Sequence, residues 1–293
     1  MSIYQLKNDQ FTLEIESFGA ELKSFKSNKT GQEYLWCADP KYWGRTSPIL
    51  FPLVGKYKNN KTYYNGIEIT SGQHGFARDT EFEFVSQTED TIWFALKSNE
   101  ETFAKYPFHF VLQVGYQLID NKVKVMWKVE NPDDNTLYFS IGAHPAFNCP
   151  LKEGEKLSDY FLLFDTTAPL TSQMMGEDGF IADGTFTVSS DNGKLRITDN
   201  LFEYNTFMLE NNQTHRISLL TPEGKEYVAV SFDAPLVAVW SPIEKNAPFI
   251  CIEPWYGRSD RSTFNQQLTE REYGHSLEKD QVFTADYTIE IND

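Results

Sequence analysis

The sequence predicts an all-β protein, a large antiparallel β-sandwich with few short helices. Apolar and polar residues alternate with a period of two in many segments, which is typical of half-buried strands. Aromatic residues, which favour strands, make up 15% of the 293 residues. Helical periodicity is scarce, and one short helix is expected over residues 100–106, with Asn99 as its cap. Strands do not alternate with long helices, so two packed antiparallel sheets are expected rather than a βαβ architecture.

The expected strands follow one another along the chain. Alternation is clear at residues 11–16, 81–85 and 92–96. The longest run, residues 108–118, is followed by an Asp120-Asn121 turn and a second run at 123–129, which predicts a hairpin. Asn65-Gly66 and Asn192-Gly193 are further turn signals. Later strands are expected at residues 159–165, 217–220, 227–232, 237–240, 248–252 and 284–291.

Composition limits the class of protein and its partners. No linker, low-complexity run or internal repeat divides the chain, so one domain over residues 1–293 is expected. The net charge of −16 disfavours nucleic acid and anionic membranes as partners. The N-terminus lacks an apolar signal region, and no apolar stretch is long enough to cross a membrane. Three widely spaced cysteines suit a cytoplasmic protein with reduced thiols.

Three segments carry polar residues where chemistry could take place. The first is residues 71–79, where Gly72 and Gly75 flank His74 just before an expected strand. Glycine on both sides lets the backbone approach a ligand closely. An ordinary glycine-rich turn with a surface histidine is the competing interpretation of this segment.

The second segment is residues 138–148, at the end of an expected strand. Tyr138, Ser140, Gly142 and His144 would share one strand face, and the small residues leave room for a ligand above the sheet. Pro145 forces His144 toward an extended backbone and ends the ladder. An imidazole there is well placed for proton transfer. The alternative is a histidine satisfied by local hydrogen bonds.

The third segment is residues 248–257. Glu253 is expected to end an apolar strand, because Pro254 follows it, and Trp255 could form a wall of a site. A carboxylate in this position is expected to be partly desolvated, which costs free energy unless the group is paired or functional. The competing interpretation is a glutamate that caps a loop or pairs with a cation.

Several other chemistries lack their signatures. No close pair of ligands predicts a zinc site, and no metal is expected. No glycine-rich phosphate loop, dinucleotide fingerprint or Gly-x-Ser-x-Gly elbow is present. Glycoside hydrolysis usually needs two carboxylates, and only one stands out.

Taken together, the segments resemble a known family. Residues 73–78, 142–148 and 253–255 resemble the aldose 1-epimerase (galactose mutarotase) family, most closely its LacX-like bacterial branch. Residues 48–56 match that branch as well. The resemblance runs over nearly the whole chain, with the three motifs in the same order, and this combination is specific.

The resemblance implies a β-supersandwich with an open cleft on one sheet and no cofactor. By motif, His74 corresponds to a histidine that positions the substrate, His144 to the general acid and Glu253 to the general base. The substrate-binding candidates on the same basis are Lys56, Arg78, Asp233 and Trp255. Many members of the family have arginine where this chain has Lys56, and lysine keeps the charge but lacks the bidentate fork.

The implied activity is interconversion of the α and β anomers of an aldose by acid–base ring opening and closure. A carboxylate and a charged imidazole could supply the two proton transfers near neutral pH. The expected partner is a small sugar, and the expected assembly is a monomer or homodimer. Two alternatives remain open: a non-catalytic carbohydrate-binding protein, and a mutarotase for hexose 6-phosphates that uses the basic residues Arg45, Lys56, Lys58 and Arg78.

Overall fold

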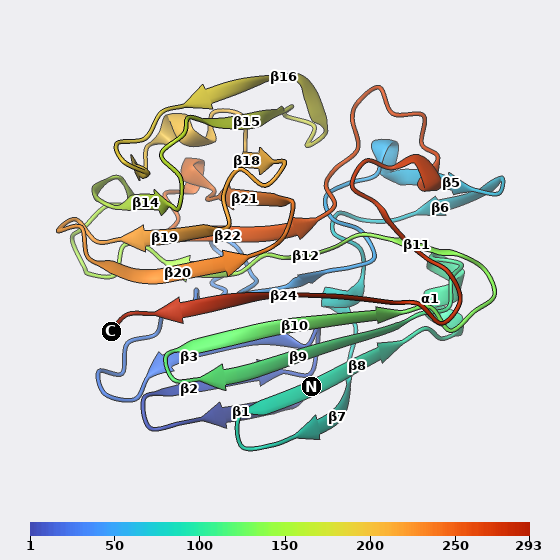
Figure 1. The fold of residues 1–293 in the computed structure, drawn as a ribbon, viewed down its shortest axis with the longest axis horizontal. Helices are drawn as coiled ribbons and strands as arrows, with labels where there is room; N and C mark the ends of the chain where they lie inside the picture. Colours follow the sequence, from blue (N-terminus) through green and yellow to red (C-terminus); the bar gives the residue numbers. More distant parts are fainter.

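Two large antiparallel sheets form the body of the protein (Figure 1). The computed structural model describes residues 1–293, with every side chain except that of Ile243. One sheet has nine strands in the order β17-β14-β19-β20-β24-β10-β9-β8-β7. The other has eight strands, in the order β16-β15-β18-β21-β22-β12-β4, with β13 also paired to β22. The predicted fold class, an antiparallel β-sandwich with little helix, is confirmed.

The strands of the nine-stranded sheet are β7 (Glu83–Gln87), β8 (Thr91–Lys97), β9 (Val111–Ile119), β10 (Lys122–Glu130), β14 (Phe161–Phe164), β17 (Lys194–Arg196), β19 (Arg216–Leu220), β20 (Glu226–Phe232) and β24 (Val282–Ile291). Those of the eight-stranded sheet are β4 (Ile49–Leu50), β12 (Ile141–Ala143), β13 (Ala146–Asn148), β15 (Leu170–Met175), β16 (Ile181–Val188), β18 (Phe207–Glu210), β21 (Leu236–Trp240) and β22 (Phe249–Tyr256). Smaller sheets are formed by β1 (Ile3–Lys7), β2 (Phe11–Glu16) and β3 (Glu21–Ser27), by β5 (Lys61–Tyr64) and β6 (Ile67–Thr70), and by β11 (Leu137–Phe139) and β23 (His275–Leu277).

Aromatic side chains join the two large sheets. Trp127 of β10 packs against Tyr256 of β22, with ring centroids 6.5 Å apart. Phe164 of β14 meets Phe207 of β18 at 6.2 Å. Each such ring removes a large apolar area from water, and edge-to-face pairs add about 0.5–1.5 kcal/mol beyond burial. Core packing therefore accounts for many of the aromatic residues in the chain.

Local sequence signals agree with the observed elements. The hairpin of β9 and β10 turns at Asp120-Asn121, and that of β5 and β6 turns at Asn65-Gly66. Asn192-Gly193 joins Asp191 and Lys194, which exchange two backbone hydrogen bonds. The one α-helix of the described residues is α1 (Glu100–Lys105), and its cap is Asn99, whose side chain accepts from the N–H of Thr102. None of the helices is long and apolar enough to cross a membrane.

One expected boundary is wrong, and its correction defines the site. β22 does not end at Glu253 but continues through Pro254 to Tyr256. The N–H of Ile252 donates to the carbonyl oxygen of Pro145. Since alternate residues of a strand present their N–H groups to the same side, Pro254 faces that same neighbour. The neighbouring chain is interrupted there, between β12 and β13, so a residue without an N–H leaves no ladder hydrogen bond unmade.

Candidate active site

The outer face of the eight-stranded sheet carries a cleft. Along β22, Ile250 and Ile252 point into the core between the sheets. The period of two therefore directs Cys251, Glu253 and Trp255 to the opposite face. A cleft of about 440 Å³ lies over this face. Its lining includes Tyr42, Trp43, Arg45, Gly55, Lys56, Gln73, His74, Arg78, His144, Met175, Glu177, Asn205, Thr206, Trp240, Glu244, Lys245, Glu253 and Trp255.

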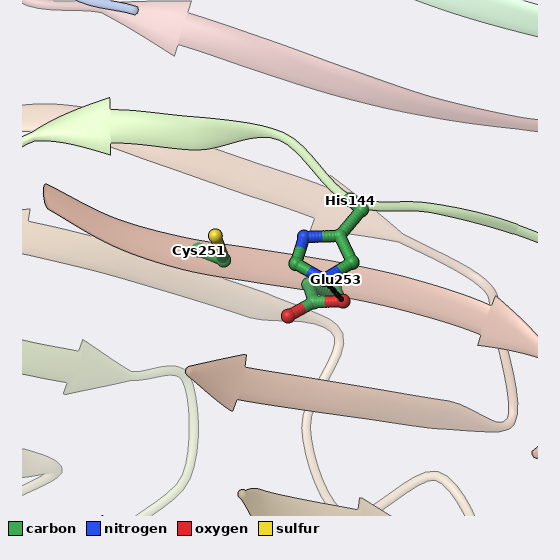
Figure 2. A group of neighbouring side chains, drawn as sticks. All are labelled: His144, Cys251 and Glu253. Atoms are coloured by element: carbon green, nitrogen blue, oxygen red, sulfur yellow. Dashed lines mark ion pairs between the residues drawn. The ribbon is translucent and has the colours of Figure 1, made fainter. Parts of the chain in front are cut away.

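His144 and Glu253 meet at the bottom of the cleft. His144 lies between β12 and β13, where Pro145 interrupts the pairing with β22 as expected. Its Nε2 lies 3.2 Å from Oε2 of Glu253, and the two side chains are 10% and 1% exposed (Figure 2). The contact is close but lacks hydrogen-bond geometry, so Glu253 Oε2 is buried without a hydrogen-bond partner. The other ring nitrogen of His144, Nδ1, is also buried without one. Unpartnered buried polar atoms are uncommon, and here they belong to two residues that line a cleft.

Burial moves the pKa values of this pair in opposite directions. It raises the pKa of Glu253 well above the ordinary carboxyl value. Burial, and then the positive charges of Arg78 and Arg45, lowers the pKa of His144 to about 3. Desolvation therefore favours a neutral imidazole beside a protonated carboxyl. The pair holds one proton over a wide pH range, and that proton can lie on either partner.

His74 is held in a single protonation state by the backbone beneath it. The N–H of Gly55 donates to its Nδ1 at 3.1 Å, and burial lowers its pKa well below the ordinary value. A ring that accepts at Nδ1 and is neutral carries its proton on Nε2. The Gln73 amide lies 3.0 Å from Nε2 and can accept that proton with its carbonyl oxygen after a half-turn of the amide. His74 is thus a neutral donor.

The turn that carries His74 is built around a close backbone approach. His74 has a φ of +67°, and its N–H donates to the carbonyl oxygen of Gly55 at 2.8 Å. Gly75 has a φ of +70°, and a Cβ there would lie 2.3 Å from the carbonyl oxygen of Phe51. Glycine is therefore required at position 75, on both counts. The His74 ring centroid lies 5.6 Å from that of His144, so the two imidazoles face one space.

Comparison with known proteins agrees with the geometry. The profile of the aldose 1-epimerase family matches residues 2–274. The chain belongs to the aldose 1-epimerase family. It is similar to the plasmid-encoded Protein LacX of Lactococcus lactis subsp. lactis, with 35% identity over 264 residues, 87% of this chain and 88% of that protein.

Solved structures show the same fold. A galactose mutarotase related enzyme from Lactobacillus acidophilus is 33% identical, with a TM-score of 0.94 over 100% of this chain and 98% of that one. A galactose mutarotase-like protein from Lactobacillus casei ATCC 334 is 28% identical, with a TM-score of 0.93 over 99% and 100% of the two chains. The predicted resemblance to the family and to its LacX-like branch is confirmed.

The substrate-binding residues predicted for this family member fall into two groups. Lys56, Arg78 and Trp255 line the cleft. Lys56 reaches across to the carbonyl oxygen of Asp178 at 3.2 Å, and Arg78 donates to the carbonyl oxygen of Gln73 at 2.6 Å. Asp233 is exposed beyond the end of β20 and is not among the residues that line the cleft.

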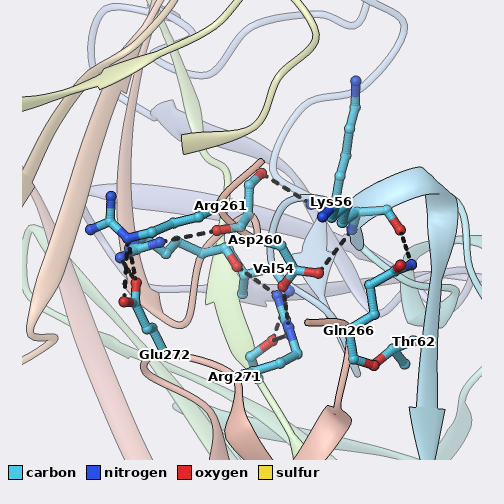
Figure 3. Close-up of polar contacts among 12 residues, drawn as sticks. Val54, Lys56, Thr62, Asp260, Arg261, Gln266, Arg271 and Glu272 are labelled. Carbon is cyan, nitrogen blue, oxygen red and sulfur yellow. Dashed lines mark hydrogen bonds and ion pairs between the residues drawn. The ribbon is translucent and has the colours of Figure 1, made fainter. Parts of the chain in front are cut away.

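An ion-paired loop fixes the segment that contacts His74. Arg271 Nε donates to Asp260 Oδ1 at 2.8 Å, and both side chains are almost fully buried (Figure 3). Asp260 Oδ2 in turn accepts from the N–H of Lys58 at 2.8 Å, and the Ser259 hydroxyl accepts from the N–H of Lys56 at 3.0 Å. The loop after β22 is thereby bound to the segment that supplies the backbone donor of the His74 imidazole.

Sequence reasoning missed part of the aromatic wall. The Trp43 ring is stacked on His144 with centroids 4.6 Å apart, and Trp240 meets the same imidazole edge-on at 5.6 Å. These rings remove water from one side of the imidazole and present apolar faces to the cleft. The signal that could have found Trp43 is the dense run Tyr42-Trp43-Gly44-Arg45 in a polar loop, because aromatic residues gathered outside any predicted strand can form the wall of a site as well as pack against the core.

One group of side chains near the base of the cleft could hold a metal ion. Ligand atoms of His144, Cys251 and Glu253 all lie within 4.8 Å of one another, and all three residues are buried. Cys251 is fully buried on the same face of β22 as Glu253. Figure 2 shows the thiol and the carboxyl projecting from one strand beside the imidazole.

Proposed function

We propose that this protein interconverts the α and β anomers of an aldose in the cleft over β22, with Glu253 as general base and His144 as general acid. The observation that carries the proposal is the contact of an imidazole and a carboxyl, 3.2 Å apart at the bottom of a polar cleft. The membership of the chain in the aldose 1-epimerase family supports it. No further cofactor is needed for the reaction.

The reaction requires one proton to leave the C1 hydroxyl and one to reach the ring oxygen. The ring C1–O bond then breaks, the aldehyde rotates about C1–C2, and closure occurs on the other face. An ionised Glu253 accepts the first proton and a charged His144 delivers the second. This ion pair contains the same number of protons as the neutral pair that burial favours. Transfer of the proton from the Glu253 carboxyl to the His144 imidazole therefore converts the neutral pair into the reactive ion pair. Sugar hydroxyls favour this transfer because they solvate the carboxylate.

His74 has a different part in this mechanism. Its Nδ1 is occupied by the N–H of Gly55, so the ring cannot become charged without losing that hydrogen bond. It acts as a neutral Nε2 donor that binds and orients a sugar oxygen, and the Gln73 amide is displaced or rotated when the sugar enters. Orientation of this kind lowers the barrier because it reduces the entropy lost on reaching the reactive geometry.

The experiment is measurement of anomer exchange. Freshly dissolved α-glucose, α-galactose and other pure anomers are followed by polarimetry or by NMR exchange, with and without the protein. The proposal predicts that at least one sugar equilibrates well above the buffer rate. A protein that binds one of these sugars but accelerates none would be a carbohydrate-binding protein instead, and the enzymatic assignment would be withdrawn.

A second candidate function has one observation in its favour. Four cations line the cleft beside three carboxyl groups, in a protein whose net charge is −16: Arg45, Lys56, Arg78 and Lys245, with Glu177, Glu244 and Glu253. Such a local excess of cations suits a phosphorylated hexose. The same exchange assay on glucose 6-phosphate separates the two: a kcat/KM at least about tenfold higher than for glucose, lost in salt, favours the phosphorylated substrate.

A further inference from the structure

We propose that His144, Cys251 and Glu253 form a binding site for a soft divalent cation such as Zn²⁺, and that the bound ion blocks the cleft. The site offers an imidazole nitrogen, a thiol sulfur and a carboxylate oxygen. Zinc binds these three ligand types, whereas Mg²⁺ and Ca²⁺ prefer oxygen alone. The inhibition by the ion rests on the proposed function, whereas the binding of the ion does not.

The geometry is close to what the ion needs. Zinc lies about 2.3 Å from sulfur and about 2.0–2.2 Å from nitrogen and oxygen, so tetrahedral ligand atoms are roughly 3.3–3.7 Å apart. The three atoms here are within 4.8 Å of one another, and shifts of about 1 Å through side-chain rotation close the difference. Cys251 and Glu253 are two residues apart on one strand, so the backbone already holds both on one face.

A second observation points to a ligand. His144 Nδ1 and Glu253 Oε2 are buried without any hydrogen-bond partner, and these residues are 8% and 1% exposed. Two unsatisfied polar atoms beside a buried thiol are unusual, because a buried polar atom without a partner costs free energy. A cation bound by Glu253 Oε2 and one imidazole nitrogen gives the carboxylate oxygen the partner that it lacks. His144 and Glu253 also line the cleft, so an ion can enter from it, and a water molecule in the cleft can complete the coordination.

Occupation of the site has a direct chemical consequence. The ion takes the lone pairs that the carboxylate and the imidazole would use for proton transfer. Two protons leave to solvent on binding: that of the thiol and the one held by the imidazole–carboxyl pair. Sugar and ion therefore compete. The Cys251 thiol contacts neither the sugar nor the moving protons in the proposed mechanism, so its role is confined to the ion.

The test uses the whole protein and Cd²⁺ as a spectroscopic probe, with Zn²⁺ for calorimetry and inhibition. Wild type is expected to show a cadmium–thiolate charge-transfer band with one ion per chain, and no response to Mg²⁺. Cys251→Ala should lose the band and bind Zn²⁺ at least about 100-fold more weakly, since the loss of groups that merely support the ligands already costs 10–100-fold. Cys37→Ala, which removes the exposed cysteine, should keep the charge-transfer band and the wild-type zinc affinity.

Activity gives the second readout. Zinc should reduce the rate of anomer exchange by the wild-type protein to the buffer rate, and a chelator should restore the catalysed rate. Excess sugar should raise the zinc concentration needed for inhibition. Cys251→Ala should keep the metal-free rate and resist zinc; Cys251→Ser serves if the alanine variant fails to fold. Equal zinc affinity in wild type and Cys251→Ala, or no binding at all, overturns the proposal. A cadmium band in a protein that anomerises no sugar keeps the metal site and removes the proposed function.

Discussion

Replacement of Glu253 by glutamine should make the protein less active and more stable. Glutamine keeps the volume and the reach of the side chain but cannot accept a proton. The C1 hydroxyl then loses its base, and anomer exchange should fall by about 10²–10⁴-fold, which corresponds to about 3–5 kcal/mol of barrier. Sugar binding should survive, because an amide still forms hydrogen bonds with hydroxyl groups.

The difference in the free energy of unfolding between Glu253→Gln and wild type depends on pH, and the burial of Glu253 determines its direction. The pKa of Glu253 is raised in the folded protein, so its contribution to stability is fully present below the unfolded value of 4.5 and is lost as the pH rises. Glutamine does not titrate. The free energy of unfolding of Glu253→Gln should therefore equal that of wild type near pH 4 and exceed it by about 1.4 kcal/mol more for each pH unit above pH 5. At about 2–4 °C per kcal/mol, this is roughly 3–6 °C per pH unit.

The assay is thermal unfolding of wild type and variant between pH 4 and 7, beside anomer-exchange rates at each pH. His144 is present in both proteins, and the substitution leaves the two main causes of its lowered pKa, burial and the charge of Arg78, unchanged. Glu130→Gln, at an exposed strand position without an ion pair, is the matched control and should change neither quantity. A variant that keeps full activity, or a stability difference that does not change with pH, refutes the reasoning.

Three further predictions follow from the same structure. The pH–rate profile should have a broad plateau, because the imidazole–carboxyl pair keeps one proton over a wide pH range. Its acidic limb should lie well below 6.5, the ordinary pKa of histidine, and its alkaline limb well above 4.5, the ordinary pKa of glutamate. A narrow bell-shaped profile centred between those values would contradict this. Gly75→Ala should cost at least about 2 kcal/mol more in urea unfolding than Gly66→Ala, since both have a positive φ but only the first would bring a Cβ to 2.3 Å from the Phe51 carbonyl oxygen. Arg271→Met should destabilise by about 3–5 kcal/mol by leaving the buried Asp260 unpaired, and a loss below 1 kcal/mol would show that the ion pair is dispensable.

Local patterns in the sequence were sufficient for most of the fold. Alternation and turn residues predict the hairpin of β9 and β10, because both depend on neighbours in the chain. The end of β22 was misplaced, since Pro254 reads locally as a strand terminator. β22 can include Pro254 because the neighbouring strand is interrupted at Pro145, where no hydrogen bond from Pro254 is needed. The pairing of these two segments is not visible in the sequence of either one alone.

The site was predictable to a similar extent. His74, His144 and Glu253 lie in segments whose glycines and prolines mark special backbone, and the structure brings them to one cleft. Trp43 and Trp240 act through contacts with an imidazole far away in sequence, and only the dense aromatic run around Trp43 offers a local signal of such a role. The protonation states also needed the structure: the sequence predicts a charged imidazole, but burial favours the neutral pair.

Anomer exchange catalysed by the wild-type protein tests the central claim most directly. Purified protein, treated with a chelator, is added to freshly dissolved pure anomers of aldoses and aldose 6-phosphates, and equilibration is followed by NMR. The account predicts that at least one sugar equilibrates far above the buffer rate and that Glu253→Gln removes at least about 99% of the acceleration, the lower limit for a lost acid–base group. Equilibration of every sugar at the buffer rate, or an equal rate in the variant, would contradict it.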